Sequence, residues 1–152
     1  MKPRRDVRVK SCDLHFIPVA TRMPLRFGAE TTTRVTCART RVTVENGTGT
    51  TGEGWGETPL SVAWLWPSEL SYVERDAALR DFCRRVSHSF RSFAVSGHPM
   101  ELGHVFMEEA LPALWRDFNR EHGDDAALPW LADLPIPVVK NIPDGDSPPN
   151  LQ

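Results

Sequence analysis

The stretch from residue 52 to residue 67 constrains the fold most, because the residues on its two sides follow different hydrophobic patterns. Residues 41–45, before it, read RVTVE, and such β-branched runs favour an extended strand. Asn46-Gly47 then predicts a hairpin turn, since both residues adopt positive φ at little cost. The returning strand is predicted over residues 54–57, whose glycines indicate that another surface approaches the backbone closely. The stretch therefore joins a β half to a helical half.

Two more strands are predicted before this turn. In residues 7–19, Cys12, Leu14 and Phe16 alternate with polar residues, as in a strand with one buried face. Residues 31–45 are rich in Thr and Val and form the second strand. Because short connections favour antiparallel neighbours, the three consecutive strands are predicted to form an antiparallel meander.

Residues 21–29 are predicted to form a loop between the first two strands. The pattern alone favours a connection packed on the sheet, and the alternative is a loop that closes over a ligand. The residues concerned are Arg22, Met23, Leu25, Arg26 and Phe27.

The helical half begins at a capping box. Ser71 and Glu74 are spaced so that each side chain can satisfy a free N–H group at the helix start. Apolar residues then recur at steps of three and four, which places them on one stripe. Gly97 and Pro99 predict the end of this helix and the start of a second, which continues through or restarts at Pro112. The stripe consists of Leu79, Phe82, Val86, Phe90 and Phe93. The sequence thus predicts an α+β fold in which a three-stranded antiparallel sheet packs on a helical bundle.

Composition limits the partners and the compartment. A net charge of -2 gives no electrostatic reason to bind nucleic acid, and no apolar run is long enough to cross a membrane. Three widely spaced cysteines fit reduced thiols, which together with the lack of a signal sequence predicts a cytoplasmic protein.

The chain is predicted to contain one folded domain, over residues 7–133. Residues 1–6 are an expected extension, and residues 134–152 are a proline-rich tail expected to be disordered.

The search for chemistry identifies no catalytic or metal constellation. Glu101, His104 and Glu108 lie one helical turn apart, but a surface hydrogen-bonding pair is favoured over a metal site, which needs more ligands. Asp76 and Arg75 are expected on the solvent side of the first helix. Trp64 and Trp66 are expected to cover the junction between sheet and helices, with a substrate wall or a partner contact as alternatives.

Three segments in a specific order resemble a known family. They read RMPLRFG over residues 22–28, GWGETPLS over residues 54–61 and GHPMELGH over residues 97–104. Together with the predicted order of strands and helices, they are similar to the N-terminal capping domain of the enolase superfamily, in its mandelate racemase and muconate-lactonizing enzyme branch. The likeness extends over about residues 7–131.

The resemblance implies a domain that covers the mouth of a (β/α)-barrel, where Mg²⁺ helps to abstract a proton next to a carboxylate. No barrel motif occurs in these residues, so the chain is expected to be a fragment that is non-catalytic by itself, with no cofactor of its own. Its expected partners are the barrel domain or another copy of the chain, and a carboxylate-bearing small molecule. The implied substrate-facing residues lie in two loops: Arg22, Met23, Leu25, Arg26 and Phe27 in the first, and Thr58, Leu60 and Trp64 in the second.

Two alternatives belong to other classes. The first is a stand-alone protein-interaction module that uses the surface around Trp64 and Trp66. Such a module should melt cooperatively as a single species, whereas a capping domain without its barrel should expose an apolar face. The second is a small enzyme in its own right, which is disfavoured because no set of nucleophile, base or metal ligands supports it.

Overall fold

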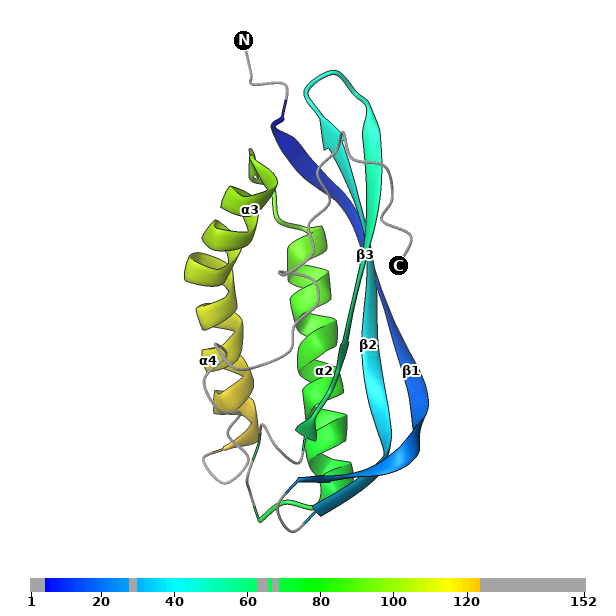
Figure 1. Ribbon diagram of the computed structural model, residues 1–152. Helices are drawn as coiled ribbons and strands as arrows, with labels where there is room; N and C mark the ends of the chain where they lie inside the picture. Colours follow the sequence, from blue (N-terminus) through cyan, green and yellow to red (C-terminus); the bar gives the residue numbers. More distant parts are fainter. Residues whose placement is uncertain (1–4, 28–29, 63–65, 67–68, 124–152) are drawn as a thin grey trace.

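The computed structural model describes residues 5–27, 30–62, 66 and 69–123. These residues form two layers, an antiparallel sheet and a layer of helices that covers one of its faces (Figure 1). The protein is therefore of mixed α+β class, as predicted.

The sheet has four strands, in the order β3-β2-β1-β4. Strand β1 (Val7–Phe27) pairs with β2 (Glu30–Asn46), and β2 pairs with β3 (Thr51–Pro59), in both cases antiparallel. The fourth strand, β4 (Ser96–Gly97), pairs with the start of β1. The prediction of three strands missed β4, because two residues are too few to produce a periodic pattern.

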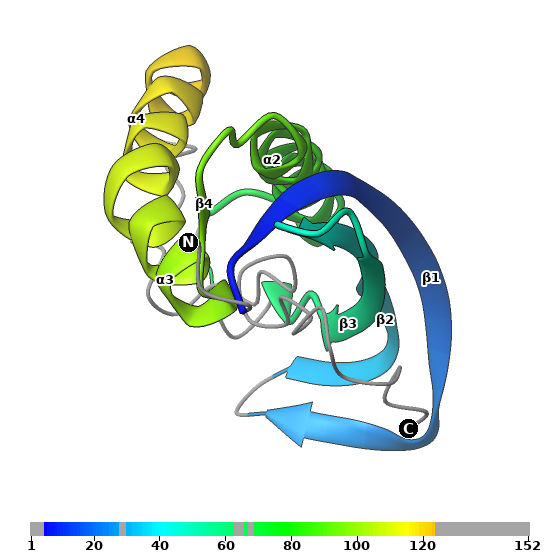
Figure 2. The same cartoon turned by 90° about the horizontal axis from the view of Figure 1, so that it is seen from above.

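The predicted loop over residues 21–29 is wrong for residues 21–27, which belong to β1. Leu25 pairs with Thr32 and Arg26 with Thr31, after a shift in register between Ala20 and Leu25. This irregularity accommodates Pro24, which cannot donate a hydrogen bond to a neighbouring strand. Figure 2 shows that the far end of β1 and β2 curves to the side of the molecule opposite α2.

The turn between β2 and β3 is held by the side chain of Asn46. Its Oδ1 accepts hydrogen bonds from the backbone N–H of Thr48 (3.0 Å) and of Thr50 (2.9 Å). The positive φ that the turn requires, 85°, falls on Gly49 rather than on Asn46 or Gly47. The turn was thus predicted at the right place with the wrong residue in the left-handed conformation, because Asn46 acts through its side chain.

Helix α2 (Tyr72–Arg91) begins with the predicted capping box. The Ser71 Oγ accepts from the Glu74 N–H at 3.3 Å, and the Ser71 N–H donates to the Glu74 carboxylate at 2.9 Å. These hydrogen bonds lower the pKa of Glu74. The carboxylate also lies where the helix dipole favours negative charge, so the cap fixes the start of α2.

The second helical segment consists of α3 (Pro99–Val105), the π-helical turn η1 (Phe106–Ala110) and α4 (Leu111–His122). The Leu111 N–H donates to the carbonyl of Phe106, five residues back. We attribute this wide turn to Pro112, whose ring would crowd the preceding turn of a regular α-helix. The described helices form a pair of rods, α2 and the α3–η1–α4 segment, and not the predicted bundle (Figure 1).

The core lies between the helices and the inner face of the sheet. The predicted stripe of α2 is buried from Leu79 to Phe90, and Phe93 packs against it. Phe106 meets Phe90 edge-to-face, with ring centroids 5.0 Å apart, and Phe118 meets Phe82 in the same way at 5.3 Å. From the sheet, the core receives Val7, Val9, Cys12, Ala38, Val42 and Val44.

Replacing Phe106 by Ala should lower the free energy of unfolding by about 3–5 kcal/mol, because it leaves a cavity beside Phe90 and Phe93. Urea denaturation followed by circular dichroism measures this loss. Val73→Ala, at an exposed position of α2, is the matched control and should change stability by less than about 0.5 kcal/mol. Equal losses in both variants would contradict the assignment of Phe106 to the core.

Candidate functional site

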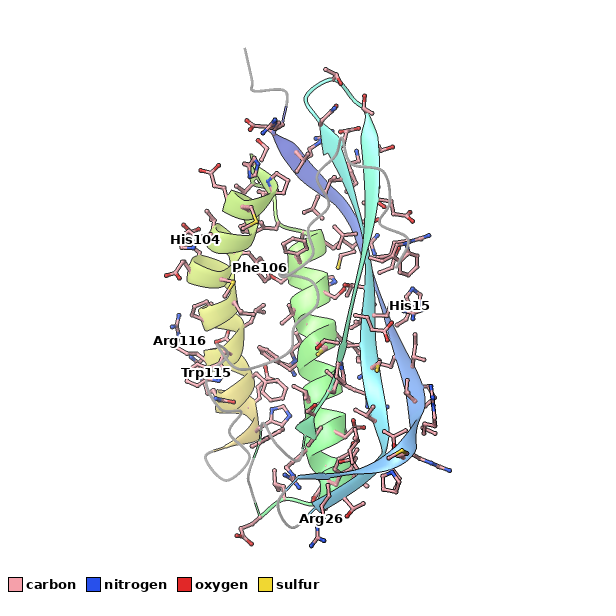
Figure 3. The ribbon with its side chains drawn as sticks, in the orientation of Figure 1. His15, Arg26, His104, Phe106, Trp115 and Arg116 are labelled. Atoms are coloured by element: carbon pink, nitrogen blue, oxygen red, sulfur yellow. The ribbon has the colours of Figure 1, made fainter. Side chains whose placement is uncertain are left out.

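The far end of the β1–β2 hairpin carries the first group of predicted site residues. Arg22, Met23, Leu25 and Arg26 are all exposed, and Met23 is 71% exposed. Figure 3 shows Arg26 at the lower end of the molecule, away from the core. Phe27 ends β1, and its side chain lies outside the described residues. Large apolar residues in a row at one exposed end are a feature of binding surfaces.

This end of the hairpin extends beyond the rest of the sheet. Strand β3 pairs with β2 only from Cys37 to Glu45, so β1 and β2 continue past it as a two-stranded ribbon. A two-stranded ribbon has little stability of its own. The apolar residues at its end therefore contribute little to the core and remain available for another surface.

Three arginines lie near the ribbon end. Arg22 and Arg26 lie on β1, and Arg34 lies opposite Ala20 on β2. Among the described side chains, none of these three guanidinium groups forms an ion pair. Unpaired arginines beside apolar residues suit a ligand or surface that carries a carboxylate.

The second group of predicted site residues lies elsewhere. Thr58 is half-buried on β3 and pairs with Ala38, whereas Leu25 pairs with Thr32. Residues 32 and 38 are about 20 Å apart along β2 at the usual rise per residue. The sheet therefore does not bring Thr58 directly beside the ribbon end.

Leu60 is fully buried in the core, and its N–H donates to the carbonyl of Thr36 at 2.8 Å. Its side chain offers no surface to a substrate in this chain, contrary to its predicted place in a substrate-lining loop. Leu60 follows β3 directly, and its apolar side chain continues the inner face of the sheet into the junction with the helices.

Trp66 is 3% exposed and belongs to the core cluster. This agrees with the favoured interpretation, in which the tryptophans cover the junction between sheet and helices. It contradicts the alternative in which Trp66 forms an interaction surface, because a buried ring cannot contact a partner. Trp64 lies outside the described residues.

Arg75 and Asp76 are buried, although they were expected on the solvent side of α2. Arg75 donates through Nη1 to the backbone carbonyl of Trp66 at 2.6 Å, and Asp76 pairs with Arg80 at 2.9 Å. The signal was present, because Arg75 precedes Leu79 by four residues and so falls on the apolar stripe. The prediction placed Arg75 on the solvent side because of its charge, although its position lies on the apolar stripe. The hydrogen bond from Arg75 to Trp66 links the start of α2 to the junction.

At the other end of the sheet, an open depression of about 440 Å³ lies beside the β2–β3 turn. Two of its charged residues, Arg8 and Glu45, form an ion pair, and the neighbouring Lys10 also pairs with Glu45. This pairing lowers the pKa of Glu45. An ion-paired depression open to solvent offers little for specific recognition. It is lined by Asp6, Val7, Arg8, Glu45, Asn46, Gly47, Gly49 and Ser96.

The described residues offer neither a cluster of typical metal ligands nor a membrane-spanning helix. Within the described part of the chain, no group of three or more His, Cys, Asp or Glu residues could hold a metal ion. Glu101, His104 and Glu108 therefore do not form a site of that kind. None of the described helices has the length and apolar character needed to span a bilayer.

Comparison with known proteins gives no family assignment, since no protein-family model and no curated protein matches the chain.

The three cysteines are buried thiols with raised pKa values. Burial raises the pKa of Cys83 to about 12, and it is also the main cause of the increase at Cys12 and Cys37. Because the thiolate is the nucleophile, a raised pKa leaves very little reactive form at neutral pH. These cysteines are suited to packing rather than to catalysis.

In the native protein at about pH 8, Cys83 should therefore resist alkylation by iodoacetamide, whereas in denaturant all three cysteines should react. Mass spectrometry of peptides after timed labelling measures each site. The denatured sample is the control for reagent activity. Rapid labelling of Cys83 under native conditions would show that its burial is wrong.

Proposed function

We propose that residues 7–123 act as the substrate-capping domain of an enolase-superfamily enzyme of the mandelate racemase and muconate-lactonizing branch. In this role the chain covers an active site that a (β/α)-barrel provides, and it is not catalytic by itself. The observation that carries the proposal is the ribbon end of β1 and β2, which extends past β3 and exposes Met23 and Leu25 beside arginines that form no ion pair with any described side chain. The α+β architecture also supports it.

The ribbon end fits a lid for three reasons. It projects from the sheet, so it can reach over a neighbouring surface. Its apolar side chains would exclude water from that surface, and water exclusion strengthens the electrostatic interactions inside an active site. Its arginines can pair with an anionic group, and the planar guanidinium of Arg26 matches the two oxygens of a carboxylate.

The reaction itself would depend on groups outside this chain. In the proposed complete enzyme, a base of the barrel would remove the proton next to a carboxylate, and Mg²⁺ held there would supply charge stabilisation. Mg²⁺ requires several oxygen ligands, and the described residues contain no cluster of acids that could provide them. The metal would therefore bind to the barrel, and the part played by this chain would be to close the site and select the substrate.

The substrate-facing residues are proposed to be Arg22, Met23, Leu25, Arg26 and Phe27 on the ribbon, with Thr58 and Trp64 as a second contact region. Leu60 is left out because its side chain is fully buried. Thr58 lies well away from the ribbon end along the sheet, so one small molecule would have to lie in the space between the two regions.

The proposal can be tested by adding the chain to the isolated barrel domain of an enzyme from the same branch. We expect it to accelerate the Mg²⁺-dependent exchange of the substrate proton into deuterated water, as followed by NMR. Arg26→Ala should reduce this acceleration about tenfold or more, because a charge-assisted hydrogen bond to the substrate carboxylate is lost.

Arg91→Ala is the matched control, because Arg91 is an exposed arginine that ends α2 and does not belong to the ribbon. It should leave the acceleration unchanged. Binding of the chain to the barrel is measured separately by calorimetry, so that lost association is not mistaken for lost substrate recognition. If the chain neither binds the barrel nor raises the exchange rate, the capping role is wrong.

A further inference from the structure

A row of sulfur and nitrogen donors runs along the outer side of the second helical segment. It consists of Met100 and His104 in α3 and Met107 in η1. Met100 is 78% exposed, Met107 is 47% exposed and His104 is also exposed. Figure 3 shows His104 on the side of α3 that faces away from α2. We call Met100, His104 and Met107 the methionine row.

The spacing of the row places its side chains together. A step of four residues within α3 places Met100 and His104 about 40° apart in arc and about 6 Å apart along the axis. Met107 follows His104 by three residues, at the start of η1, and lies on the next turn. Helical side chains lean towards the N-terminus of their helix. His104 therefore leans over the turn that carries Met100, and Met107 leans over the turn that carries His104. The three donor groups can converge near the imidazole.

The imidazole of His104 forms no hydrogen bond or ion pair with a described residue, unlike the histidines at either end of the same segment. His98 caps α3, where its Nδ1 accepts from the Met100 N–H at 3.3 Å. His122 has its Nδ1 2.9 Å from the carbonyl of Phe118, against whose ring it also stacks. Among the described residues, no hydrogen bond or ion pair engages His104.

Packing within the described residues does not explain why methionine occupies these two exposed positions. Neither contributes to the core cluster, and both expose apolar surface. A lysine or glutamate at either position would make the protein more soluble. Met has three rotatable bonds and a polarizable sulfur, so an exposed Met can adjust its position around a bound group. Glu101 and Glu108, exposed on the same two turns, add negative charge that attracts cations.

We propose that the methionine row is a binding site for a soft monovalent cation of the Cu(I) and Ag(I) class. Thioether sulfur is a soft ligand that selects such ions over Mg²⁺ or Ca²⁺, and imidazole completes a set of two sulfurs and one nitrogen. The site differs from the Glu101, His104 and Glu108 arrangement, which does not form a cluster. It is independent of the capping role.

The test uses the full chain with its methionine methyl groups labelled with ¹³C. Ag(I) is added, and each methyl signal and the His104 ring signals are followed by NMR. We expect the signals of Met100, Met107 and His104 to shift together and to saturate at the same concentration. The titration continues well past the content of the three cysteines, because thiols also bind silver.

Met23 provides the matched control, because it is exposed to a similar degree on β1 and belongs to no such row. Met100→Leu and Met107→Leu should each weaken silver binding at His104 by about tenfold or more, since loss of a supporting group already costs metal sites that much. Met23→Leu should have no effect. All three substitutions preserve side-chain volume at exposed positions, so the fold should be retained.

Two results would overturn the proposal. One is that the signals of Met100, Met107 and His104 do not move even at a large excess of silver over cysteine. The other is that Met23 shifts with the same midpoint as Met100 and Met107, which would mean that silver binds any exposed thioether.

Discussion

Helix α2 holds the molecule together, because its buried face contacts both the sheet and the second helical segment. Phe82 and Phe90 meet Phe118 and Phe106 edge-to-face, and this fixes the segment from α3 to α4. Towards the sheet, Ser87 lies within hydrogen-bonding distance (3.3 Å) of both the carbonyl and the sulfur of Cys12. Aromatic pairs of this kind add to the free energy gained by burying their surface. This packing holds the second helical segment and the inner face of the sheet on opposite sides of α2.

The same packing determines which residues are left for recognition. Strands β1 and β2 have 21 and 17 residues, but β3 has only nine, so the core cannot use the full length of the first hairpin. The outer side of α3 and η1 is likewise turned away from α2. Both surfaces carry large exposed side chains that the core does not need. Either surface can therefore bind a partner without loss of packing among the described residues.

The two surfaces call for different chemistry. The ribbon end combines apolar residues with arginines that form no ion pair among the described side chains, which suits a carboxylate-bearing group beside an apolar surface. The methionine row combines thioethers with an uncommitted imidazole, which suits a soft cation. Because they use different donors and lie on different elements, either proposal can fail without affecting the other.

The sequence by itself determined the features that depend on near neighbours in the chain. These are the alternation of Cys12, Leu14 and Phe16 along β1, the apolar stripe of α2 and the capping box at Ser71, all set by periods of two or about four residues. Tertiary structure alone decided what depends on distant partners. Residues 25–27 became part of a strand because residues 30–32 lie beside them, and β4 formed because Val7 lies opposite Gly97. Burial of Leu60 was decided in the same way, since it depends on which surfaces close over the junction between sheet and helices, and a local pattern does not contain that information.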